Sequence, residues 1–141
     1  SGNFMCTSFK TELLKGVHNF TAASNVFKLA MYTNSASFNA ATTAYTSSNE
    51  VSGTNYTAKG NAITTVTPTS SGTTAFVDMD NVVFTNVTLT GVRGALIFNE
   101  AASGDPTVCV LDFGGDKASS AGDFTVVMPT ADASNAIIRI A

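Results

Sequence analysis

Charged side chains are scarce in this sequence. Asp, Glu, Lys and Arg make up 12% of the 141 residues, about half of their share in an average soluble domain. The 7 basic residues are scattered singly and the formal net charge is −3, so no basic patch is available to bind a phosphate backbone. We therefore expect no direct contact with nucleic acid.

Long apolar runs are also missing. No stretch approaches the roughly 18 apolar residues from which a membrane-spanning helix is recognised. The first residues do not combine a charged segment with an apolar one, which is the pattern of a secretory signal peptide. These features predict a protein that has no membrane partner.

Residues that carry catalysis or bind metals are few. His18 is the single histidine and lies beside no acid or nucleophile motif, so the sequence does not assemble a catalytic triad around it. The tripeptide Asp112-Phe113-Gly114 copies a kinase motif without the other kinase motifs. We expect no enzyme activity, no metal site and no cofactor.

Two questions stay open on sequence alone. Cys6 and Cys109 are expected as buried free thiols, as in a protein made in a reducing compartment, although a disulfide between them is compatible with the sequence. Asp112 and Asp116 offer oxygen ligands near a turn, although the chain lacks the twelve-residue loop pattern of a calcium site.

The abundant residues are those of strands and turns. Hydrophobic residues make up 44% of the chain, and most of the polar remainder is Thr, Ser and Asn, together with 11 Gly. Thr favours strands, whereas Ser, Asn and Gly favour turns. A chain of this length is one domain and can bury a core without disulfides. The composition argues against a helical enzyme.

Two short apolar runs form the centre of the predicted fold. Residues 95–98 and 108–111 are rich in β-branched and aromatic side chains and are separated by a turn sequence at residues 103–106. We expect them to form a central hairpin covered on both faces. Further strands are predicted at 26–32, 63–67, 74–79, 82–84, 87–89, 124–128 and 136–140, with turns or breaks at 68–72, 114–115 and 119–122. This spacing predicts an all-β domain over residues 7–141, an antiparallel β-sandwich or jelly roll of about eight strands.

One short helix is predicted, at residues 7–16, after an N-terminal arm at residues 1–6. Thr7 or Ser8 can cap its N-terminus, and Gly16 suits the left-handed position just past a helix end. Its apolar stripe must pack on the chain's own sheet or on a neighbouring subunit, because two helical turns are not stable alone in water.

The longest stretch without an apolar period is residues 34–60. Loops longer than about 15 residues are uncommon in compact domains unless they are functional or disordered. We expect an ordered surface excursion with a short helix at residues 39–43. This loop, with Tyr45 and Tyr56, is a candidate contact surface.

Short motifs occur in order along nearly the whole chain. They are Phe9-Lys10, Glu12-Leu13, Gly16, His18-Asn19-Phe20, residues 27–32, Tyr45-Thr46, Glu50-Val51, Gly53, Tyr56, Ala58, Gly60, residues 93–99, residues 111–117 and residues 136–141. Together they resemble a family of small structural virion proteins of tailed bacteriophages. Two departures are that the 27–32 motif matches with a shift of one residue and that Phe98 replaces a tyrosine.

The resemblance implies a protein made in the cytoplasm of a host bacterium and located in the virion, at the capsid surface. We expect a capsid decoration, or cement, protein that binds the major capsid protein in many copies and stabilises the mature shell. Such proteins often act as homotrimers at threefold points, where contacts close into rings. The expected contact residues are Phe4, Met5, Phe9 and Leu13, together with the 34–60 loop.

Two other functions compete with this one. A tail or fibre module that binds host-surface glycan needs an exposed aromatic platform, which Tyr32, Tyr45 and Tyr56 could supply, although Trp is absent. A small hydrolase is disfavoured because no nucleophile–base pair is evident.

Overall fold

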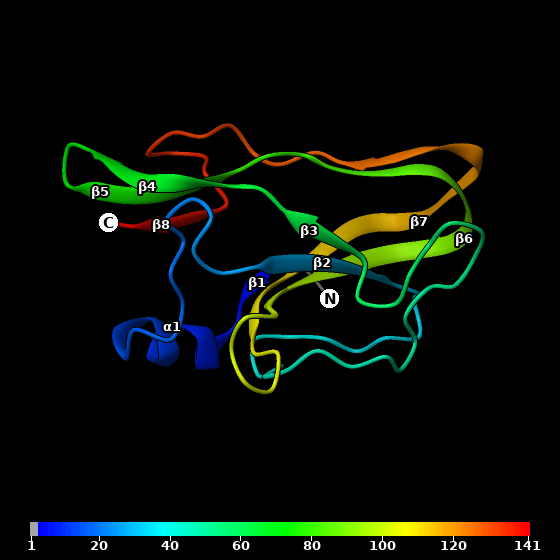
Figure 1. Cartoon of the computed structure of the whole chain (residues 1–141), viewed down its shortest axis with the longest axis horizontal. Helices are drawn as coiled ribbons and strands as arrows, with labels where there is room; N and C mark the ends of the chain where they lie inside the picture. Colours follow the sequence, from blue (N-terminus) through cyan, green and yellow to red (C-terminus); the bar gives the residue numbers. More distant parts are fainter. Residues whose placement is uncertain (1–2) are drawn as a thin grey trace.

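Two antiparallel sheets and one short helix make up the structure, a computed structural model that describes residues 3–141 (Figure 1). The elements of this described part are β1 (Phe4–Met5), α1 (Thr7–Leu14), β2 (Phe27–Tyr32), β3 (Asn61–Ile63), β4 (Thr65–Ser71), β5 (Thr74–Met79), β6 (Val82–Asn99), β7 (Thr107–Val126) and β8 (Ile138–Ile140). The larger sheet has the strand order β1-β7-β6-β2-β3, and the smaller has the order β4-β5-β8. The predicted all-β, sandwich-like fold of about eight strands is confirmed.

The predicted central hairpin is present and is longer than its apolar runs. Ala95 pairs with Leu111 and Ile97 pairs with Cys109, in antiparallel register. The strands continue well past these pairs, to 18 residues in β6 and 20 in β7. The short strands predicted at 82–84 and 87–89 are therefore parts of β6. The strand predicted at 124–128 is the end of β7 but stops at Val126, two residues earlier than predicted.

The ribbon formed by β6 and β7 folds back on itself at the right of Figure 1. At the bend Val92 of β6 pairs with Lys117 of β7, and Gly94 pairs with Asp112. Between these two pairs β7 has more residues than β6, so the extra residues of β7 bulge out. Gly91 and Gly114 take φ angles of 63° and 78° there, a conformation that glycine adopts at little cost. The turn predicted at residues 114–115 is thus a bulge inside one strand.

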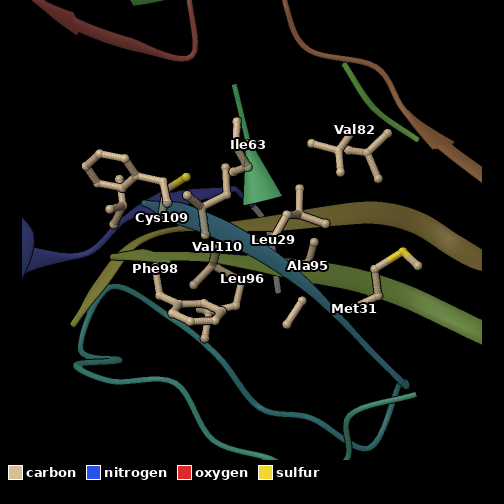
Figure 2. Packing of buried hydrophobic residues seen from close by; sticks show 14 of the residues in the cluster. Leu29, Met31, Ile63, Val82, Ala95, Leu96, Phe98, Cys109 and Val110 are labelled. Atoms are coloured by element: carbon tan, nitrogen blue, oxygen red, sulfur yellow. The ribbon is translucent and has the colours of Figure 1, made fainter. Parts of the chain in front are cut away.

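The fold-back gives the sandwich its two layers. In Figure 1 the start of β6 and the end of β7 lie above their own other halves, which pair with β2 and β1. The core fills the space between them, and Figure 2 shows Val82 of the upper layer above Ala95 and Met31 of the lower one. All three side chains are buried, so the inward-pointing apolar side chains of both halves of the ribbon face one shared core.

The opposite face of the lower layer is covered by residues 33–60. The Phe38 ring packs edge-on against Tyr32 of β2, with ring centres 4.6 Å apart, and the Tyr45 ring lies 4.8 Å from that of Phe98 of β6. The central strands are therefore covered on both faces, as predicted. The helix predicted at residues 39–43 is wrong, because this part is an irregular coil with one turn closed by the Thr42 N–H donating to the Asn39 carbonyl, at 3.0 Å.

The smaller sheet continues from the upper layer as a hairpin flanked by β8. Its turn is at Gly72, whose φ is 61°, so the turn predicted from Pro68 begins too early. Pro68 instead lies within β4, in the interval between Val66 and Thr69 where the register shifts. A proline is tolerated there because β4 is an edge strand and the ladder is interrupted at that point.

Helix α1 ends as predicted but begins differently. Past its end Gly16 has a φ of 76°, the Gly16 N–H donates to the Leu13 carbonyl, and the Val17 N–H donates to the Glu12 carbonyl. This is the paired bonding of a Schellman motif. At the start, Cys6 takes the capping position and no side chain caps the helix, so capping by Thr7 or Ser8 is wrong.

Gly94 offers a test of the ribbon geometry. A β-carbon at this position would collide with the Leu111 carbonyl oxygen on the paired strand, whereas one at Gly115 would meet open space. We expect Gly94→Ala to lower the free energy of unfolding by about 1–3 kcal/mol, the usual range for overpacking, as measured by urea denaturation. Gly115→Ala is the matched control and should change it by less than about 0.5 kcal/mol. Equal effects of the two substitutions would contradict the close approach of the strands.

Candidate partner-contact surfaces

The N-terminal segment forms an edge of the larger sheet. Phe4 and Met5 make up β1 and pair with β7, with Phe4 exposed and Met5 half-buried. Asn3, just before β1, also contacts β7, because its Oδ1 accepts a hydrogen bond of 2.7 Å from the Asp112 N–H. Residues 3–5 of the predicted arm therefore lie on the sheet, and residues 1 and 2 of that arm lie outside the described part. Phe4 and Met5 border a shallow hollow of about 160 Å³ with Ile137.

The other two expected anchors lie on α1 and differ from each other. Phe9 is fully buried, with its ring centre 5.0 Å from that of His18 and 5.9 Å from that of Phe20. In this conformation its side chain packs in the chain's own core. Leu13 is half-buried and lies at the surface.

An apolar groove, which we call the α1–β5 groove, separates α1 from the smaller sheet. Its volume is about 130 Å³. It is lined entirely by uncharged, mostly apolar side chains, those of Leu13, Phe20, Pro68, Ala75, Phe76, Val77, Ile138 and Ile140. Leu14, the residue after Leu13, is 92% exposed. The arrangement of α1 below β5 and β8 at one end of the molecule can be followed in Figure 1.

His18 is a structural residue, as its sequence context suggests, although the structure gives it an acidic neighbour. Its Nε2 lies 3.0 Å from Glu12 Oε1, and its Nδ1 lies 3.1 Å from the Asn99 side-chain nitrogen. The Asn99 amide is oriented by the Ala101 N–H, which donates to its Oδ1. Asn99 therefore donates to Nδ1, and the ring proton on Nε2 donates to Glu12. Because the imidazole is fully buried, no substrate can reach it.

Tyr45 and Tyr56 contact a carboxylate of their own chain. Both hydroxyls donate to Glu50, to Oε1 and Oε2 respectively, each at 2.6 Å. The Lys59 N–H donates to Oε2 at 2.9 Å. The Tyr56 hydroxyl also accepts a 3.0 Å bond from the Met31 N–H of β2. We call Glu50, the side chains of Tyr45 and Tyr56, and the backbone N–H groups of Lys59 and Met31 the Glu50 cluster. This cluster ties the 34–60 loop to the sheet.

Tyr32 completes this region from the strand side. It is buried, and its hydroxyl donates to the Thr46 carbonyl at 2.6 Å. The Tyr56 ring stacks near Phe84, with ring centres 5.7 Å apart. All three tyrosines of the chain thus have their rings packed against aromatic partners and their hydroxyls engaged in hydrogen bonds.

Burial and the Glu50 carboxylate both act on these phenols. Burial is the largest cause of the shift in all three phenols. The second cause is the hydrogen bond to Glu50 for Tyr45 and Tyr56 and the charge of Glu50 for Tyr32, and together these raise the pKa of each tyrosine well above the ordinary value of 10.0. The three tyrosines therefore stay protonated in the folded protein over the physiological pH range.

A group of opposite charges lies beside the loop. Lys59 Nζ is 2.8 Å from Asp105 and 3.6 Å from Glu100, and Lys28 Nζ is 3.3 Å from the same glutamate. These pairs join the 34–60 loop, β2 and the turn between β6 and β7. They are partly exposed, so water screens them and each contributes little to stability.

The two cysteines are buried free thiols, the state expected for them. Burial raises the pKa of Cys6, and it raises that of Cys109 to about 12. Thiols with raised pKa values are poor nucleophiles, because the thiolate is the reactive form.

Two further hollows lie along β7, with volumes of about 440 and 510 Å³. They share Phe113, Val126 and Val127, and Val127 is 72% exposed. Such volumes fall in the range of small-molecule sites.

No three His, Cys, Asp or Glu side chains within residues 3–141 are grouped closely enough to hold a metal ion. The described part also has no helix that is long and apolar enough to cross a membrane.

Comparison with known proteins gave no match, whether by family models, curated sequences or solved structures. The surfaces above must therefore be interpreted from their own chemistry.

The sequence singled out Leu13 and the tyrosines as contact residues, which stays a prediction, but it did not reveal the features around them. The groove depends on β5 and β8 meeting α1, which no local pattern reveals. The Glu50 cluster left a weak signal, a lone carboxylate between two tyrosines in a stretch almost without charge.

The raised tyrosine pKa values predict a loss of stability in alkali. Above pH 10 the unfolded chain releases phenolic protons that the folded chain retains, so unfolding becomes more favourable as the pH rises. Each retained proton contributes about 1.4 kcal/mol per pH unit. We expect tyrosinate absorbance to appear together with the loss of circular dichroism, in one cooperative transition. Titration of the tyrosines near pH 10 in a protein that remains folded would contradict this packing.

Replacing Glu50 tests the cluster directly. Glu50→Gln removes the negative charge that accepts hydrogen bonds from Tyr45, Tyr56 and the Lys59 N–H. The new amide NH₂ would face one of these donors and could not accept its hydrogen bond. We therefore expect the free energy of unfolding to fall by about 2–3 kcal/mol. Glu100→Gln is the control, since it neutralises a carboxylate in partly exposed ion pairs with Lys28 and Lys59 and should cost less than about 1 kcal/mol. Urea denaturation of both variants measures the difference. Similar losses would mean that Glu50 is only a surface charge.

Proposed function

We propose that this protein is a structural component of a tailed-bacteriophage virion, of the capsid decoration type. The observation that carries the proposal is where the motifs of the family resemblance lie in the fold. Gly16 ends α1, Glu50 holds the long loop, and residues 111–117 form the bulge at which the ribbon bends. Residues that carry the resemblance are therefore residues that build a rigid scaffold.

The surface chemistry supports a binding role that does not depend on charge. The exposed side of the 34–60 loop is mainly Ser, Thr and Asn, and the exposed large apolar side chains, such as Phe4, Leu14 and Val127, are spread over several elements. In this proposal Phe4 and Met5, at the free edge of β1, contact the major capsid protein. A contact of this kind, repeated over many copies, stabilises the shell by binding linkage.

The tyrosines favour this role over glycan binding. A carbohydrate platform needs an exposed aromatic face. Tyr32 is buried, and the rings of Tyr45 and Tyr56 pack against Phe98 and Phe84. Tyr32 is thus buried and Tyr45 and Tyr56 are half-buried with their rings packed on other aromatic rings, which weakens the alternative of a tail or fibre module.

Copy number in purified virions tests the proposal. We expect quantitative mass spectrometry to give about one copy per shell subunit, or one trimer per threefold position, relative to the major capsid protein. The physical reason is that a cement protein must occupy equivalent sites over the whole shell. A few to a few dozen copies per particle would contradict the decoration role and indicate a place in the tail or its fibres.

A further inference from the structure

A buried polar junction joins α1 to the end of β6. His18 and Asn99 are both buried, and the rings of Phe9 and Phe27 lie beside the imidazole. His18 Nδ1 is 3.1 Å from Asn99 Nδ2, and His18 Nε2 is 3.0 Å from Glu12 Oε1 of α1. A buried polar group costs free energy when its hydrogen bond is not made. The junction is therefore stable when each of its donors faces an acceptor.

The orientation of the Asn99 amide is fixed from two sides. Its Oδ1 accepts a 3.0 Å hydrogen bond from the Ala101 N–H, and its Nδ2 donates a 3.2 Å bond to Asn25 Oδ1. That oxygen of Asn25 is itself held, because it also accepts a 2.8 Å bond from the Asn19 N–H. Reversing the Asn99 amide would set its NH₂ against the Ala101 N–H and its oxygen against Asn25 Oδ1, and both bonds would be lost. Asn99 therefore presents a donor to His18, and Nδ1 accepts.

This arrangement fits the neutral imidazole and not the charged one. With Nδ1 as an acceptor, the ring proton is on Nε2 and donates to Glu12. A second proton on Nδ1 would place an N–H opposite the NH₂ of Asn99, and two donors cannot form a hydrogen bond. Histidine is the side chain whose charge ordinarily changes between about pH 5 and 8, so mild acid supplies the proton that opposes this contact.

The charged groups around the ring decide which contact breaks. Glu12 of α1 faces Nε2, and its carboxylate attracts a protonated ring. The side chains that β2 and β6 present to the ring, Phe27 and Asn99, are uncharged. The charged residues next to them, Lys28 and Glu100, pair with each other at 3.3 Å. The protonated ring therefore keeps its bond to α1 and loses its bond to β6.

We propose that His18 is a proton-operated latch, which holds α1 against the end of β6 at neutral pH and loosens it in mild acid. Loosening α1 gives water access to Phe9, which is fully buried when the latch is closed. It also changes the surface around Leu13 on the same helix. The latch goes beyond the proposed virion role and does not rest on it, since it is built from contacts within one chain.

Nuclear magnetic resonance of the full chain at about pH 7.5 and about pH 5, on either side of the ordinary titration of histidine, tests the latch. His18 is the single histidine, so its ring signals are unambiguous. At the higher pH the ring ¹⁵N shifts should show a proton on Nε2 and none on Nδ1. At the lower pH, protonation of Nδ1 should coincide with a change in the Asn99 side-chain amide signals. The exchange protection of the α1 amides should fall about tenfold, which corresponds to about 1.4 kcal/mol, while that of Leu96 in β6 stays constant.

Two variants separate the proton from the rest of the fold. His18→Gln keeps a side-chain donor for Glu12 but has no group that titrates in this range, so the protection of α1 should be equal at both pH values. Asn99→Asp replaces the opposing donor with an acceptor for protonated Nδ1, so α1 should stay protected in acid. Asn39→Asp is the matched control. Asn39 is exposed and its Oδ1 already accepts a bond from the Ala41 N–H, so this variant should loosen in acid like the unaltered chain.

Several results would overturn the proposal. One is a proton on Nδ1 at about pH 7.5, within the ordinary neutral range of histidine, because Asn99 could not then donate to it. Another is protonation of Nδ1 that leaves the Asn99 signals and the α1 protection unchanged, or a ring that stays neutral over an α1 that stays protected at the lower pH. Equal loosening in folded His18→Gln would also overturn it, since the proton would then act elsewhere. Circular dichroism verifies that the variants are folded.

Discussion

The bend in the β6–β7 ribbon is the constraint on which the rest of the structure depends. One hairpin supplies strands to both layers, so the core can close only if the ribbon turns back at a single place. The bulge between Asp112 and Lys117 lengthens one strand at that place, and Gly91 and Gly114 accept the backbone angles. Most of the core, including Phe84, is formed because the two halves of the ribbon then face each other.

A second constraint is the carboxylate beneath the long loop. Apolar side chains such as Phe38 and Val51 pack the loop on the sheet. Glu50 adds polar contacts by accepting hydrogen bonds from Tyr45, Tyr56 and the Lys59 backbone, and these offset the desolvation of its charge. The loop then becomes a third layer over β2 and β6, and the surfaces presented to a partner are preorganised.

The elements whose residues form a local sequence pattern could be predicted from the sequence. The strand at 74–79 and the helix end at Gly16 are local, and the central hairpin is fixed by two apolar runs around a turn. The full length of β6 and β7 could not be predicted, because Asn86 and Ala121 take positive φ at irregularities that interrupt the alternation. The contact between Tyr45 and Glu50 could not be predicted, because it forms only once the loop folds over the sheet.

Hydrogen exchange along β6 is the measurement that tests this account most directly. If the ribbon folds back around one core, amides at residues 82–89 and 92–99 lie in one cooperative unit. Their protected amides should then exchange only through global unfolding, with the same free energy in both halves and the same denaturant dependence. Exchange of residues 82–89 at a much lower free energy would contradict the account, since it would mean that the upper half of the ribbon opens separately from the lower.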